Sequence, residues 1–191
     1  MAGRRLLLQL AGSALIPGLG TQALSSAAPG GAAPAPPAEL ADLPNAQWIG
    51  RSRMRFFGFD IYDIQLWAAP GFRASQYAQH ALALELTYLR ALSGDAIAER
   101  SVQEMRRGSD LSSAQEQLWL SAMRNAFPDV RQGDRITGMH HPANGARFWF
   151  NGKPRGAITD PEFSRLFFGI WLAETTSEPR LRSALLAGAA P

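Results

Sequence analysis

Between residues 47 and 188 the spacing of apolar residues changes repeatedly between that of a strand and that of a helix. Successive side chains of a strand point to opposite faces, whereas helix residues three and four apart share one face. Strand-like spacing predicts strands at 47–56, 59–67, 82–88, 135–140, 148–150 and 156–158. Helix-like spacing predicts helices at 95–108, 113–127, 161–171 and 181–186. Because strands and helices come in groups and do not alternate one by one, we predict an α+β fold in which helices pack on an antiparallel sheet.

Three of the predicted helices begin with capping signals. Asp95 is a good N-cap for the first helix, and Ser113 followed three residues later by Glu116 is a capping-box pattern for the second. Asp160 precedes Pro161, and proline is favoured at the first helical position. These signals support the helix starts given above.

The first three strands sort their side chains by chemistry. One face of the first strand carries Trp48, Met54 and Phe56, and the other carries Arg51, Arg53 and Arg55. A tyrosine lies in line with aliphatic residues on the next two strands, in the sets Tyr62, Ile64, Leu66 and Leu82, Leu84, Leu86, Tyr88. Asp60 and Asp63 are expected on opposite faces of a regular second strand.

Basic and phenolic side chains gather on these strands and define the candidate site. Its members are Arg53, Arg55, Tyr62, Tyr88 and Arg90, with Arg51 beside them. Guanidinium and phenol groups can hold a carboxylate or an enolate while an apolar tail lies in the core. The same pattern also fits a solvated strand face with ordinary tyrosines at the edge of the core.

Residues 1–46 differ in composition from the rest of the chain. A short basic start followed by an apolar run is typical of a signal peptide, predicted at 1–28, and the arginine pair at positions 4 and 5 resembles a twin-arginine leader. The apolar run is too short to span a membrane, so we expect a periplasmic protein without a stable span after cleavage. Residues 29–46 are rich in Ala, Pro and Gly and predict a semi-extended linker to a domain at 47–188. A disordered Ala-rich tail is the alternative for the first segment.

The sequence lacks the motifs of several functional classes. The chain has no Cys, and its adjacent His140 and His141 would point to opposite faces of a strand, so no metal site is expected. No Gly-x-Ser-x-Gly or phosphate-binding loop is present, and we expect no cofactor. A formal net charge of +3 is too small to indicate a nucleic-acid partner.

An ordered set of segments resembles the bacterial exported branch of the chalcone isomerase-like family. The segments are FFGFDIYDIQLWA, LELTYLRALSGDAIAERSVQEMRR, FPDV with GDRITG, ARFWFNG, FFGIWL and PRLRSALL. The resemblance implies an open-faced sandwich with a cleft between sheet and helices. In plant enzymes of the family this cleft cyclises a chalcone to a flavanone, and related plant members resemble fatty-acid binders that hold the carboxylate with an Arg and a Tyr.

The resemblance also places the family's functional positions on this chain. The strand threonine of the enzymes falls on Tyr62, and their late Thr or Ser falls near Ile170, which has no hydroxyl. The guiding arginine corresponds to Arg53 or Arg55. The resemblance therefore favours a non-catalytic protein that binds a small amphiphilic anion such as a fatty acid. An intramolecular lyase or isomerase of the chalcone isomerase type and an envelope protein-interaction module are the alternatives, and the oligomeric state is left open.

Overall fold

The computed structural model describes residues 33–189. The predicted signal peptide at 1–28 and the first residues of the predicted linker lie outside the described residues.

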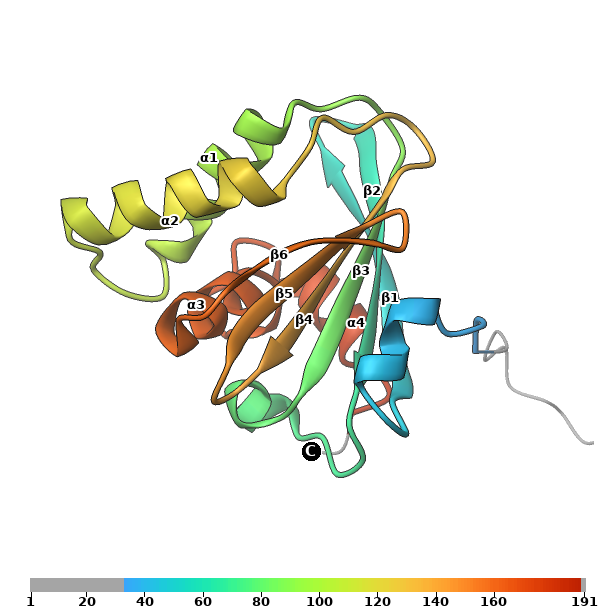
Figure 1. Ribbon diagram of the computed structural model, residues 1–191. Helices are drawn as coiled ribbons and strands as arrows, with labels where there is room; N and C mark the ends of the chain where they lie inside the picture. Colours follow the sequence, from blue (N-terminus) through green and yellow to red (C-terminus); the bar gives the residue numbers. More distant parts are fainter. Residues whose placement is uncertain (1–32, 190–191) are drawn as a thin grey trace, which may run out of the picture. The chain divides into compact units, whose positions relative to one another are not determined.

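Within residues 33–189, six strands form one antiparallel sheet in which each strand pairs with the next along the chain. They are β1 (Gln47–Phe56), β2 (Phe59–Ala68), β3 (Leu82–Tyr88), β4 (Arg135–His141), β5 (Gly145–Phe150) and β6 (Lys153–Ile158). The helices are α1 (Gly94–Met105), α2 (Ser113–Ala126), α3 (Pro161–Leu172) and α4 (Pro179–Leu185), with the 3-10 helices η1 (Ala38–Asp42) and η2 (Ala74–Gln79). The helices α3 and α4 pack on the face of the sheet that we call the helix face, and η1 lies on the opposite, outer face (Figure 1). The predicted α+β fold is confirmed.

The N-caps of α1 and α2 lie earlier than predicted. Ser93 caps α1 in place of Asp95, and Ser112 caps α2 in place of Ser113 with Gln115 as its capping-box partner. In both cases the residue with extended backbone is the one whose hydroxyl can accept from the backbone N–H three residues on. The predicted Asp-Pro start of α3 is confirmed.

One irregularity in the β1–β2 ladder changes which side chains share a face. Met54 pairs with Tyr62, but the register shifts between Met54 and Arg55, so that Arg55 pairs with Asp60. An extra residue on one strand turns the following side chains to the other face. Asp60 and Asp63 therefore both contact Arg53, and the expectation that they lie on opposite faces is wrong.

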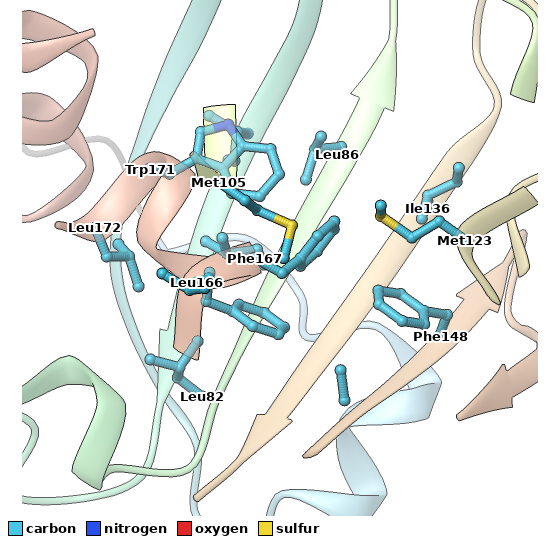
Figure 2. Close-up of a cluster of buried hydrophobic side chains, with 14 of the residues drawn as sticks. Leu82, Leu86, Met105, Met123, Ile136, Phe148, Leu166, Phe167, Trp171 and Leu172 are labelled. Carbon is cyan, nitrogen blue, oxygen red and sulfur yellow. The ribbon is translucent and has the colours of Figure 1, made fainter. Parts of the chain in front are cut away.

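The main core lies between the helix face and the helices. Phe167 and Trp171 of α3 pack toward Leu86, Ile136 and Phe148 of the strands (Figure 2). All five side chains are buried. The apolar residues that alternate along the predicted strands are thus the residues that fill this core.

A smaller cluster covers the outer face and corrects the predicted linker. Leu40 and Leu43 are each 5% exposed and pack with Trp67, Met139 and Trp149. Residues 38–43 are therefore part of the domain and not a solvated spacer. Their composition predicts a spacer because it contains few large apolar residues, but the sheet offers those few an apolar surface that no local pattern reveals.

Candidate ligand-binding cavity

A cavity of about 220 Å³ lies between the helix face and the helices α1 and α3. Its size is just below the roughly 300–1,000 Å³ of common small-molecule sites. The wall is mainly apolar and includes Leu84, Leu86, Ile136, Phe148, Phe167 and Trp171. Figure 2 shows several of these side chains facing one another across the space between α3 and the strands. Such a wall suits an aliphatic or aromatic group.

Two tyrosines bring hydroxyl groups to this apolar wall. Tyr62 and Tyr88 are register partners on β2 and β3, and their rings meet edge to face with centroids 5.9 Å apart. The indole Nε1 of Trp171 donates to the Tyr62 hydroxyl oxygen at 2.9 Å. Among residues 33–189, neither tyrosine hydroxyl donates its own proton to an acceptor. Each therefore keeps a donor for a ligand.

Burial holds both hydroxyls in the form that can donate. It raises the pKa of Tyr62 to about 12, although the Trp171 hydrogen bond works in the opposite direction. Burial raises the pKa of Tyr88 further, and the neighbouring Tyr62 adds to the effect. Both phenols are protonated at neutral pH, so they can donate to a carbonyl or carboxylate oxygen.

Charged groups lie on the cavity wall at α1 and just before α4. Arg100 and Glu104 form an ion pair one helical turn apart, and Glu178 lines the same cavity. The Glu104 side chain is only 9% exposed, and its Oε2 lies 3.8 Å from the Arg107 Nε but has no hydrogen-bond partner in the part of the chain described. The wall thus carries one cation and two carboxylates. An anionic head group needs Arg100 released from Glu104.

The structure separates the five predicted site residues into two groups. Tyr62 and Tyr88 line the cavity. Arg53 donates to Asp63 at 2.6 Å and to Asp60 at 2.9 Å, and Arg55 donates to Asp60 at 2.7 Å. These arginines are strand neighbours of Met54, which faces the cavity, so alternation turns them away from it.

The fifth predicted residue, Arg90, is also outside the cavity lining. Its side chain is exposed and its guanidinium carbon lies 5.0 Å from the centre of the Phe59 ring. Arg90 therefore belongs to the surface near the β1–β2 turn. Of the basic residues in the predicted set, none lines the cavity.

Three lining residues, Arg100, Glu104 and Trp171, are not among the site residues predicted from the sequence. A usable signal was present on α1, where Ile97, Arg100 and Glu104 repeat at the spacing of one helix face. That face contacts the cavity.

A second cavity, of about 300 Å³, adjoins the first at Glu104 and is more polar. Its arginines are engaged by the protein. Arg107 donates to the carbonyl oxygen of Thr175, and Arg182 donates to that of Leu172. These bonds satisfy carbonyls at and just after the end of α3, so we interpret this cavity as a structural junction.

Two classes of feature are absent from residues 33–189. They contain no cluster of three or more His, Cys, Asp or Glu side chains placed to bind a metal ion. None of their helices combines the length and the apolar character needed to cross a membrane.

Comparison with known proteins identifies relatives of the whole domain. A family model described as "Chalcone isomerase-like" matches residues 50–187. An uncharacterized protein of Haemophilus influenzae is 28% identical over 145 residues, which cover 75% of this chain and 70% of the relative. The crystal structure of a fatty-acid binding protein of Arabidopsis thaliana matches with a TM-score of 0.60 at 12% identity, covering 75% of this chain and 87% of the plant chain. At this identity the plant structure shows that the fold is shared.

Proposed function

The chain belongs to the chalcone isomerase-like family, and we propose that it binds a small amphiphilic ligand, such as a fatty acid, in the cavity between the sheet and the helices α1 and α3. The observation that carries this proposal is the pair of unused phenol donors, Tyr62 and Tyr88, on an otherwise apolar wall. Buried polar groups normally have partners, so unused donors at a cavity indicate a position for ligand oxygen.

The two ends of such a ligand fit different parts of the cavity. The apolar tail lies against Leu84, Ile136 and Phe148, and the head-group oxygen accepts from Tyr62 and Tyr88. A shared fold with a plant fatty-acid binding protein supports an acyl ligand. Arg100, whose side chain is 55% exposed, supplies the positive charge for a carboxylate when it leaves Glu104, and Arg107 stays 3.8 Å from the Glu104 carboxylate to offset part of its charge.

Binding is tested with dodecanoic acid and, as a neutral match, dodecanol. At a ligand concentration one hundred times Kd we expect about 2.7 kcal/mol of stabilisation, a rise in Tm of roughly 5–10 °C. Tyr62→Phe combined with Tyr88→Phe removes both donors without opening a void, and should weaken binding by about tenfold. Protein that gains no thermal stability from either compound, and that carries no lipid on native mass spectrometry, contradicts the proposal.

The same phenol pair supports a second candidate, an intramolecular lyase or isomerase. Two protonated hydroxyls in an apolar cavity can stabilise an oxyanion, and the buried Glu104 carboxylate can act as a base. This candidate requires that the protein accelerate chalcone cyclisation above the rate in buffer and that Tyr62→Phe with Tyr88→Phe abolish the acceleration. Ligand binding without any acceleration leaves the first proposal alone.

We also propose that the chain is an exported, periplasmic member of its family. The support is the succession of basic, apolar and small residues in 1–28. Cell fractionation checks this, since export predicts a shortened periplasmic form. Replacement of both leader arginines by lysine should block export if the twin-arginine route is used.

A further inference from the structure

The turn between β1 and β2 exposes three phenylalanines. Phe56, Phe57 and Phe59 are 50%, 86% and 61% exposed, and we call them the aromatic turn. Among residues 33–189 the only other exposed large apolar side chain is Leu118 on α2, at 65%. A group of exposed aromatic residues on one turn is uncommon on a soluble domain and indicates an interaction site.

The backbone of the aromatic turn favours a different residue at its tip. Phe56 pairs with Phe59, so Phe57 and Gly58 form a two-residue turn, and their φ angles are 47° and 81°. Turns with positive φ at both positions prefer Asn or Asp followed by Gly, and a bulky aromatic residue is disfavoured there. The sequence thus keeps a Phe at the most exposed point of the turn although Asn would suit the backbone better. A local choice that opposes stability is expected where a function requires the side chain.

The surroundings of the aromatic turn are basic. Arg53 and Arg55 are paired with Asp60 and Asp63. Arg90, which stacks on Phe59, forms no ion pair within the described part of the chain. The turn therefore combines exposed aromatic rings with one uncompensated positive charge, that of Arg90.

The aromatic turn also lies at the same end of the sheet as the tyrosine end of the cavity. Phe56 and Phe59 follow Met54 and precede Tyr62 on their strands, and both of these residues line the cavity. Figure 1 shows the β1–β2 turn at the end of the sheet where the chain leaves β3 for α1.

We propose that the aromatic turn docks the protein on an anionic lipid bilayer, with the three phenyl rings in the interfacial layer and the arginines at the head groups. Aromatic side chains favour this layer, and basic residues near it are attracted to anionic lipids. A protein partner fits less well, because a specific interface buries about 800 Å² on each side and three side chains of one projecting turn supply only a fraction of that area. Docking here brings the cavity to the surface from which an amphiphile would be taken.

The first test places a reporter on the turn of the full chain. Because the chain has no Cys, Phe57→Cys and, as the matched control, Leu118→Cys each give a single attachment point for an environment-sensitive fluorophore. The probes are vesicles of phosphatidylglycerol and phosphatidylcholine in equal parts, vesicles of phosphatidylcholine alone, and buffer. We expect a blue-shifted, brighter signal from position 57 with the anionic vesicles and no change from position 118. Comparing two positions of one chain separates the turn from any contribution of residues 1–28.

The second test removes the aromatic tip without harming the fold. Phe57→Asn suits the turn, so Tm should stay the same or rise, while partition into the anionic vesicles should fall about tenfold or more. The double variant Phe56→Ser with Phe59→Ser should reduce partition into the anionic vesicles more than Phe57→Asn does. Leu118→Ser should leave that partition unchanged. Added salt should weaken binding to the anionic vesicles.

The outcomes are decisive and independent of the ligand proposal, because no ligand is added. Equal signals from positions 57 and 118, or unchanged partition of Phe57→Asn, overturn the docking proposal. A dimer that forms without vesicles and is lost in Phe57→Asn also overturns it, since the turn then serves a second copy of the chain. Tyr62→Phe with Tyr88→Phe should bind vesicles normally even if it has lost dodecanoic acid.

Discussion

Both faces of the sheet bury polar groups among apolar residues, but the hydrogen bonding of these groups differs between the faces. On the outer face, Glu39 accepts hydrogen bonds from the Thr137 hydroxyl at 2.6 Å and from Arg135 at 3.1 and 3.3 Å. On the helix face, Tyr62 and Tyr88 keep unused donors beside a cavity. Residues 38–43 cover the outer face, whereas the helix face keeps an open cavity and unused hydrogen-bond donors. The outer face also buries the indole N–H groups of Trp48 and Trp67 without partners, so an unused donor indicates a ligand position only where it borders a cavity, as at Tyr62 and Tyr88.

The largest expected effect comes from opening the outer face. Leu40→Ala with Leu43→Ala removes two buried side chains from the cluster around Trp67 and Trp149. We expect a loss of about 4 kcal/mol or more in the free energy of unfolding, measured by urea denaturation. Leu118→Ala, on an exposed residue, is the control and should change it by less than about 0.5 kcal/mol. A double variant as stable as the parent would show that residues 38–43 do not hold this face.

Single polar substitutions on the two faces should have opposite effects on stability. Glu39→Leu leaves Arg135 and Thr137 without their acceptor and should cost about 1–3 kcal/mol. Tyr88→Phe removes a hydroxyl that has no protein partner, so stability should be unchanged or rise by up to about 1 kcal/mol. Urea denaturation of both variants checks this. A large loss of stability in Tyr88→Phe would contradict the interpretation of its hydroxyl as a free ligand donor.

His140 provides a pH test, because it is a polar group that the protein does satisfy. Its Nδ1 lies 2.6 Å from the Ser164 hydroxyl oxygen and its Nε2 lies 3.0 Å from the carbonyl oxygen of Ala78. Burial lowers the pKa of His140 below its ordinary value of 6.5. The unfolded chain therefore takes up a proton as pH falls below about 6.5 while the folded chain resists it, so stability falls with pH there.

The matched control for this prediction is the adjacent, exposed His141. Denaturation of the parent across pH 5–8 should show a loss of stability toward acid of at most about 1.4 kcal/mol per pH unit from this group. His141→Gln should keep that loss. His140→Gln should flatten the pH dependence, and an unchanged slope in His140→Gln would rule out His140 as its source.

The smallest expected effect concerns the charges at the cavity. Glu104→Gln frees Arg100, so Kd for dodecanoic acid should fall by about two- to fivefold, while Arg100→Gln should raise it by a similar factor. Dodecanol should respond to neither change. Isothermal titration calorimetry measures Kd for each of the four combinations of variant and ligand. An equal response of acid and alcohol would show that the head group does not contact Arg100.

Much of the fold follows from the sequence because its cause is local. Alternation predicted the strands, three- and four-residue spacing predicted the helices, and their order predicted the α+β class. The same alternation correctly set Tyr62 and Tyr88 in line with Leu66, Leu84 and Leu86 on the face that forms the core. These features depend only on near neighbours along the chain.

The candidate site was only half predicted, since it depends on contacts between distant segments. Alternation placed Arg53 and Met54 on opposite faces of β1, but it could not tell which of the two faces the helices cover. The bulge beside Arg55 then brought Asp60 and Asp63 together on Arg53. No local pattern records such a shift in register.

The sequence by itself thus determined the strands and α-helices of this protein, their order, their apolar faces and the resemblance to its family. Only the tertiary structure decided that residues 38–43 cover the outer face, and that Trp171 and Arg100 join the tyrosines at the cavity. Periodicity reports which side chains share a face of one element. Which faces meet is decided by packing between elements far apart in the chain. That packing must bury apolar area and also give the buried polar groups hydrogen-bond partners.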